Sequence, residues 1–162
     1  MKQLNEQEIL HIAASYCSMV ERCIYDVRKK IASVGASPET GERIIAHLLK
    51  EKFIDEARYC RGFVNDKFRF NRWGRIKIGY ELRGKNVDDI LISEAMSTID
   101  EDEYESVVIA LLKEKKRTVK GKDGHAVFSK LYRFAIGRGF ESNLIVQQLR
   151  KLLNTSFDAD LD

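Results

Sequence analysis

Basic side chains between residues 58 and 85 recur at spacings that place them on helix faces. One set, Arg58, Arg61 and Arg69, is spaced for a single helix, and a second set, Arg72, Arg75 and Arg83, is spaced for the next. A guanidinium group can donate two parallel hydrogen bonds to a carboxylate or a phosphate. The pattern therefore predicts a surface for an acidic protein groove or for a nucleic acid backbone. The candidate contact residues are Arg58, Arg61, Arg69, Arg72, Arg75, Lys77, Arg83 and Lys85.

Charge is distributed in blocks along the chain. Residues 67–85 carry seven bases and one acid, residues 86–105 carry eight acids and no base, and residues 113–133 carry eight bases and two acids. Blocks of this kind predict charged patches on the folded surface, although alternating solvated helix faces explain any single block equally well.

The sequence offers no catalytic or metal-binding constellation. His11, His47 and His125 are far apart and lack the spacing of known zinc motifs. The segment 121–124 contains two glycines and a lysine but not the GxxxxGK[ST] pattern of a phosphate loop. The motifs therefore predict no catalytic, cofactor or metal site; an enzyme would require a site that is assembled only in space, which the sequence cannot show.

Composition favours a helical, cytoplasmic protein. Of the 162 residues 44% are hydrophobic and only one is proline, which suits a packed helical core. The three cysteines lack CxxC spacing and are expected to be buried free thiols in a reducing compartment. The first residues contain no apolar signal region, and no apolar run approaches the length of a membrane span.

The elements that position the basic residues recur three times. Candidate helix ends at Gly35, Asn86 and Gly139 are separated by 51 and 53 residues, and apolar positions recur at the same offsets. The offsets predict an all-α fold of three tandem three-helix repeats forming an elongated, curved array. The predicted boundaries are 1–53, 54–101 and 102–154, followed by an acidic flexible tail at 155–162.

Helix limits follow from periodicity and capping residues. Ser37 with Pro38, and Asp55 with Glu56, read as helix starts. The other predicted helices cover residues 8–20, 21–32, 72–83, 104–117, 126–137 and 142–153.

The predicted helix 72–83 has two apolar sides. Ile78 and Leu82 occupy the core positions that recur in the repeats, whereas Trp73, Ile76 and Tyr80 lie elsewhere on the helix. Large aromatic side chains at helical spacing are usually buried, so packing against a neighbouring repeat is the favoured interpretation. The alternative is that part of this second side binds a partner.

Two segments carry a family resemblance. Phe53-Ile54-Asp55-Glu56-Ala57-Arg58-Tyr59 and Leu82-Arg83-Gly84-Lys85-Asn86-Val87-Asp88 resemble the core signature of the RecX family, bacterial regulators of the RecA recombinase. The resemblance extends over residues 8–153 and is weakest in the first repeat. Family members often have glycine where this chain has Asn86, but asparagine also suits a helix end.

The resemblance implies a non-enzymatic regulator of DNA repair. It implies a three-repeat helical fold, docking in the helical groove of RecA–DNA filaments, and restraint of homologous recombination, ATP hydrolysis and repressor cleavage in the SOS response. The third helices of the repeats open with acidic or apolar residues, which disfavours base reading by a helix-turn-helix. A nonspecific DNA-binding helical module and an unrelated structural adaptor remain as alternatives.

Overall fold

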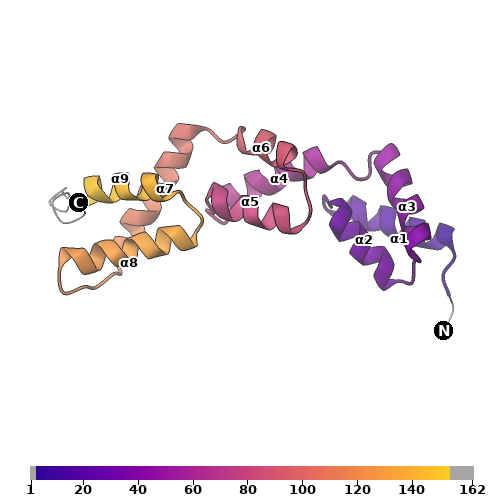
Figure 1. Ribbon diagram of the computed structural model, residues 1–162, viewed down its shortest axis with the longest axis horizontal. Helices are drawn as coiled ribbons and strands as arrows, with labels where there is room; N and C mark the ends of the chain where they lie inside the picture. The colour runs from indigo at the N-terminus through magenta and orange to yellow at the C-terminus, as the bar shows by residue number, and fades with distance from the viewer. Residues whose placement is uncertain (1–2, 154–162) are drawn as a thin grey trace. The chain divides into compact units, whose positions relative to one another are not determined.

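The structure is a computed structural model that describes residues 3–153, and every regular element in that range is an α-helix. Figure 1 shows the order of these helices along the chain. The helices are α1 (Glu6–Met19), α2 (Ile24–Ser33), α3 (Pro38–Lys50), α4 (Glu56–Arg69), α5 (Arg75–Gly84), α6 (Asp89–Met96), α7 (Glu101–Lys116), α8 (Gly124–Gly137) and α9 (Ser142–Leu152).

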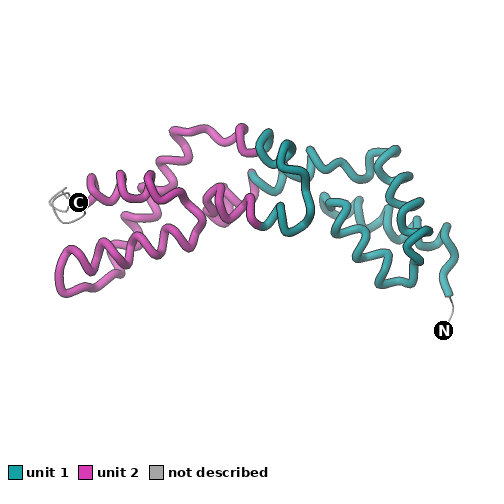
Figure 2. Tube along the Cα trace, viewed as in Figure 1, with its two compact units in different colours: residues 1–64, 81–95 teal, residues 65–80, 96–162 magenta. Residues whose placement is uncertain are grey.

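The chain forms two compact units, coloured separately in Figure 2. The first unit comprises residues 1–64 and 81–95, and the second comprises residues 65–80 and 96–162. Helices α4 and α5 are therefore each divided between the two units, α4 after Val64 and α5 after Tyr80. The predicted acidic tail, 155–162, lies outside the described residues.

In the first unit, α1, α2 and α3 pack against one another around an aliphatic core. Helix α1 begins in a capping box, where Asn5 Oδ1 accepts from the Glu8 N–H at 2.8 Å and Glu8 accepts from the Asn5 N–H. Helix α3 begins as predicted, with Ser37 as the N-cap and Pro38 in the first turn. The core residues are Ile9, Ala13, Cys17, Val27, Ile31, Ile44, Ile45, Leu48 and Ile54.

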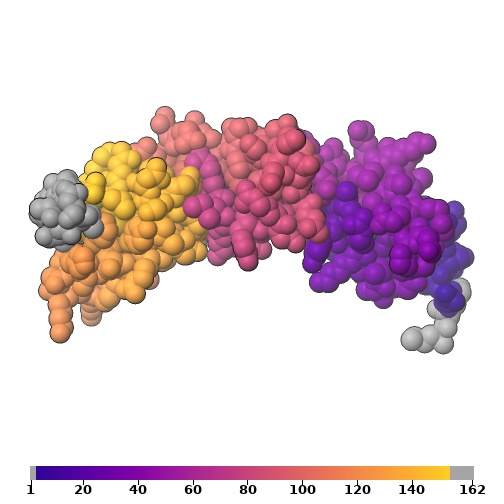
Figure 3. Space-filling view, in the orientation of Figure 1, coloured from indigo at the N-terminus to yellow at the C-terminus, as the bar shows by residue number. Residues whose placement is uncertain are grey.

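In the second unit, α7, α8 and α9 form the corresponding three-helix arrangement. Phe68 of α4 and Ile78 of α5 are buried in the same unit. In the space-filling view, side chains fill the gaps that Figure 1 leaves between the ribbons (Figure 3). The other large buried residues are Tyr104, Val108, Leu111, Leu112, Phe128, Leu131, Phe140, Ile145 and Leu149.

The three predicted helix ends share one geometry. Gly35, Asn86 and Gly139 have φ values of 98°, 58° and 93°, in the left-handed region. The N–H of the residue after each of them donates to the carbonyl five positions earlier, the 6→1 hydrogen bond of a Schellman motif, at 3.1, 3.2 and 3.3 Å. The acceptors are the carbonyls of Ile31, Leu82 and Ala135, so the offsets of 51 and 53 hold at atomic level. The all-helical repeat prediction is confirmed.

Three helix starts differ from the prediction by three residues. Helix α2 begins at Ile24, because Cys23 is extended with ψ near 171°. Helix α5 begins at Arg75, because Arg72 is left-handed with φ 54° and so interrupts the helix. Helix α7 begins three residues early, because Asp100 acts as its N-cap and accepts from the Glu103 N–H at 2.9 Å. Arg72 is therefore a loop residue and does not belong to the α5 stripe.

None of the helices within residues 3–153 combines the length and the apolar character needed to cross a membrane.

Candidate partner-binding surface

The eight predicted contact residues are divided equally between the two units. Arg58, Arg61, Arg83 and Lys85 belong to the first unit, and Arg69, Arg72, Arg75 and Lys77 belong to the second. Most of them are engaged by carboxylates of this chain, so the number of cations open to a partner is smaller than the sequence suggested.

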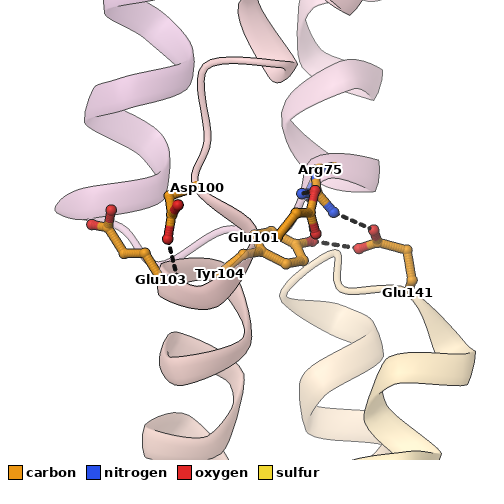
Figure 4. A network of polar contacts seen from close by, with 6 residues as sticks. All are labelled: Arg75, Asp100, Glu101, Glu103, Tyr104 and Glu141. Atoms are coloured by element: carbon orange, nitrogen blue, oxygen red, sulfur yellow. Dashed lines mark hydrogen bonds and ion pairs between the residues drawn. The ribbon is translucent and has the colours of Figure 1, made fainter.

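Arg75 is the centre of a polar network in the second unit (Figure 4). Its Nη1 lies 2.9 Å from Glu141 Oε2, and its Nη2 pairs with Glu101. The guanidinium carbon lies 3.9 Å from the centroid of the Tyr104 ring, a cation–π arrangement. The side chain of Arg75 is only 22% exposed. The prediction that Arg75 is an exposed charge is wrong, because this network covers its guanidinium group.

Tyr104 connects this network to the core. Its hydroxyl accepts from the Arg75 N–H at 3.0 Å and donates to Glu141 Oε1. Its ring, 1% exposed, contacts Phe68 and Phe140 with centroid separations of 5.6 and 5.3 Å. Burial, and then the hydrogen bond to Glu141, raise the pKa of the Tyr104 hydroxyl. The hydroxyl is therefore protonated at neutral pH and can serve as the donor.

Two glycines allow the backbone before α5 to meet the turn after α8. The Gly74 and Ile76 N–H groups donate to the carbonyls of Arg138 and Gly139 at 2.8 and 3.0 Å. A Cβ at Gly74 would lie 2.3 Å from the Gly139 oxygen, and a Cβ at Gly139 would lie 2.3 Å from Lys77 Cβ. The turn thus supplies acceptors for donors at the start of α5 that have no partner within the helix.

Other arginines of the predicted stripe bind acids of the chain. Arg69 pairs with Glu103 at 2.8 Å, and Arg72 pairs with Glu114 at 3.0 Å, both in the second unit. In the first unit, Arg83 pairs with Asp89 at 2.9 Å. The acidic block 86–105 therefore neutralises part of the basic block 67–85.

Arg58 and the start of α4 have structural roles in the first unit. Asp55 is the predicted N-cap, and its Oδ1 accepts from the Arg58 N–H at 3.0 Å. This hydrogen bond is the main cause of a lowered Asp55 pKa. The Arg58 side chain pairs with Glu21 and donates to the Lys52 carbonyl at 3.0 Å. Arg58 thereby ties α4 to the segment between α1 and α2.

Lys85 belongs to a second, half-buried cluster in the first unit. Its Nζ lies 2.9 Å from Asp26 Oδ1 and 5.8 Å from the centroid of the Tyr59 ring. Burial alone would raise the pKa of Asp26, but hydrogen bonds from Lys85 and Cys23 outweigh it and lower the pKa. Burial likewise opposes the charge on Lys85, but Asp26 and Tyr59 raise its pKa overall.

The three cysteines are buried free thiols, as predicted. Burial is the largest cause that raises the pKa of Cys17, and it raises the pKa of Cys23 and of Cys60 to about 11. Protonated thiols are poor nucleophiles and poor metal ligands. These side chains therefore act as small apolar core residues.

Some cations have no carboxylate partner among residues 3–153. Arg61 is exposed and forms no ion pair with another described residue, whereas Lys77 is half-buried, with its Nζ 4.4 Å from the centroid of the Trp73 ring. A larger set of exposed cations lies in the third repeat, where the sequence predicted only a basic charge block. Those exposed side chains, for which residues 3–153 supply no ion-pair partner, are Lys113, Lys116, Arg117, Lys120 and Lys122.

An open groove of about 430 Å³ in the second unit combines cations with aromatic side chains. Its lining includes Arg72, Lys115 and Arg138, with Phe70 and Phe134 beside them. Arg138 is held by the Asn71 carbonyl, which accepts from its Nη1 at 2.9 Å. Glu114 is the single acid of the lining, so the groove suits an anionic ligand.

The chain is similar in sequence to proteins that are named as regulatory proteins. The family model described as "RecX, second three-helix domain" matches residues 55–96. A protein named regulatory protein RecX from Prosthecochloris aestuarii is 30% identical over 155 residues, which cover 94% of this chain and 99% of the relative. This chain belongs to the RecX family. A RecX protein of Clostridium tetani is also 30% identical, over 82% of this chain and 60% of the relative.

Solved RecX structures have the same fold. A crystal structure of RecX from Lactobacillus salivarius matches with a TM-score of 0.79 at 17% identity, over 91% of this chain and 96% of the other. A second RecX crystal structure matches with a TM-score of 0.77 at 19% identity, over 92% of this chain and 73% of the other. These two RecX structures thus share the fold of this chain at low sequence identity.

Proposed function

We propose that this RecX-family protein binds RecA–DNA filaments and restrains their recombinase, ATPase and coprotease activities in DNA repair and the SOS response. The observation that carries the proposal is the similarity to a RecX protein along nearly the whole length of both chains. The protein acts without catalysis, as a cytoplasmic monomer that docks reversibly on the filament. A regulatory role without catalysis agrees with the names of the relatives, which are regulatory proteins.

The eight basic residues have different roles in this proposal. Exposed Arg61 and half-buried Lys77 contact the partner directly, since neither forms an ion pair with another described residue. Arg69, Arg72 and Arg83 are exposed ion-pair members that can exchange an internal carboxylate for a carboxylate or phosphate of the filament. Arg58, Arg75 and Lys85 act by holding their helices in place.

The test is inhibition of DNA-dependent ATP hydrolysis by RecA of the same organism. Inhibition at protein concentrations below that of RecA supports docking on the filament. A protein that leaves the ATPase, strand exchange and repressor cleavage unchanged, under conditions where RecA filaments form, contradicts the proposal.

A nonspecific DNA-binding module is the second candidate, favoured by the exposed lysines of the third repeat and by the anion-suited groove. Binding through phosphates alone falls steeply with salt, because each neutralised phosphate releases counterions. Fluorescence anisotropy with filaments and with naked DNA at several salt concentrations separates the candidates. Filament docking requires higher affinity for the filament near physiological salt, whereas equal affinities with equal salt slopes favour the DNA module.

A further inference from the structure

The outer face of α5 is apolar and exposed, contrary to the packing favoured by the sequence. Ile76 is 56% exposed and Tyr80 is 74% exposed. They are four residues apart, so their side chains are neighbours on one helix face. Ile78, on the other side of α5, is fully buried. The core-packing interpretation is therefore wrong for Ile76 and Tyr80, although Trp73 is partly covered.

Trp73 and Lys77 extend this face into a stripe. Positions 76, 77 and 80 of α5 fall within about 100° of one another at 3.6 residues per turn, and Trp73 lies two residues before the helix begins. The Lys77 Nζ lies 4.4 Å from the centroid of the Trp73 ring, so the Trp73 side chain adjoins this side of α5. The Ile76 N–H bonds to the Gly139 carbonyl, so the backbone that presents the stripe is fixed. We name Trp73, Ile76, Lys77 and Tyr80 the α5 face.

We infer that the α5 face docks on the protein subunits of the filament, at an acidic surface that offers an apolar pocket. This inference rests on the proposed function and identifies which component of the filament the face contacts. An aliphatic and an aromatic side chain one turn apart form the pattern of a helix that places anchors in a groove. Aromatic side chains are enriched among residues that dominate binding energy.

Charge and ring geometry favour a protein surface over nucleic acid at this face. Lys67 and Lys77 both lie over the Trp73 ring, at 4.9 and 4.4 Å, so a stacked base would have to displace an ammonium group. Ile76 has no π-face on which a base could stack. The two ammonium groups are complementary to carboxylates at the rim of an apolar pocket.

The test is the double variant Ile76→Ser/Tyr80→Ser, with a matched control of the same composition. Tyr25 and Ile90 of the first unit are also exposed, at 39% and 67%, so Tyr25→Ser/Ile90→Ser removes the same side chains elsewhere. The α5 variant should bind RecA–DNA filaments at least about 10-fold more weakly, and the control should bind within about 3-fold of the original. Both variants should bind naked single-stranded DNA as the original protein does.

Each other outcome has a distinct meaning. If the original protein binds filaments and the two variants match it, the α5 face is not the contact, and the proposed function survives. If the original protein does not bind filaments, the proposed function itself fails. If the α5 variant loses affinity for naked DNA by the same factor, the face contacts nucleic acid, and the inference is overturned.

A second measurement places the contact directly. Trp73 is the only tryptophan of the chain, so 5-fluorotryptophan labelling gives a single ¹⁹F resonance beside the α5 face. Filaments should shift or broaden this resonance, and naked DNA at equal saturation should not. The same response to both ligands would overturn the assignment to a protein surface.

Discussion

Arg75 and Tyr104 are joined twice, through the backbone and through the ring. The Arg75 N–H donates to the Tyr104 hydroxyl at 3.0 Å, and the guanidinium carbon lies 3.9 Å from the Tyr104 ring centroid. Glu141 completes the arrangement, because it accepts from both side chains. An arginine that the sequence offers as a partner contact is thereby part of the packing between α5, α7 and the start of α9.

Replacing Arg75 should destabilise the second unit. In Arg75→Met the aliphatic stem can still pack, but Glu141 loses a charged donor and the Tyr104 ring loses its cation. We expect a loss of about 1–3 kcal/mol in the free energy of unfolding. Urea denaturation followed by circular dichroism measures it, with Arg61→Met as the matched exposed control. A loss no larger than that of the control would contradict the structural role of Arg75.

Removing the Tyr104 hydroxyl should have a comparable effect. Tyr104→Phe keeps the stacked ring but leaves the Arg75 N–H and the Glu141 carboxylate short of a partner in a part-buried site. We expect about 1–2 kcal/mol of destabilisation. Tyr132→Phe, whose hydroxyl bonds to Ser142 at an exposed site, is the control and should cost less. In a double-mutant cycle, Tyr104→Phe and Arg75→Met should be non-additive.

The Asp26–Lys85 pair should make stability depend on pH. The folded-state pKa of Asp26 is lowered, so its contribution is present above its unfolded pKa of about 3.9 and is lost as pH falls through the folded value. The pKa of Lys85 is raised, so its contribution is full below about pH 10.4 and is lost only at more alkaline pH. Asp26→Asn should therefore cost about 1–2 kcal/mol at pH 7 and less at pH 3.

Denaturation curves of the Asp26→Asn variant and the original protein at both pH values test this prediction. Asp89→Asn, at the exposed pair with Arg83, is the control and should change stability little at either pH. A cost of Asp26→Asn that is the same at pH 3 and pH 7 would show that packing, rather than the charge, is the source.

Gly35 and Gly139 allow strain and steric clash to be separated. Both have φ near 95°, but an added Cβ meets nothing within 4 Å at Gly35 and lies 2.3 Å from Lys77 Cβ at Gly139. Gly35→Ala should cost about 1–2 kcal/mol, from the left-handed backbone alone. Gly139→Ala should cost clearly more, since the α5 backbone must also move. Equal costs at the two positions would mean that the contact between the turn and α5 relaxes freely.

Local features were predictable from the sequence because short-range chemistry determines them. The left-handed helix ends at Gly35, Asn86 and Gly139, and the caps at Ser37 and Asp55, each follow from one residue and its near neighbours. The Schellman geometry confirms the repeat offsets because the same local solution recurs three times.

Long-range features were not predictable in this way. The bond from Arg75 to Glu141 spans 66 positions, and helical periodicity cannot indicate which distant acid will neutralise an arginine. The left-handed Arg72 was missed because glycine or asparagine normally marks such a position. The exposure of Ile76 and Tyr80 was missed because composition cannot distinguish an apolar face that meets a neighbouring helix from one that meets solvent.

Charge reversal can show which exposed cations dock on the filament. Arg61→Glu/Lys77→Glu changes two cations of the second repeat that form no ion pair with another described residue, and Lys113→Glu/Lys116→Glu changes two exposed cations of the third. Exposed charges contribute about 0–1 kcal/mol to folding, so each variant should melt within a few degrees of the original protein. We expect the first variant to weaken inhibition of the RecA ATPase by about 10-fold or more, because complementary charges control docking. A stronger effect from Lys113→Glu/Lys116→Glu would move the main contact to the third repeat. Full inhibition by both variants would contradict an electrostatic contribution from either set.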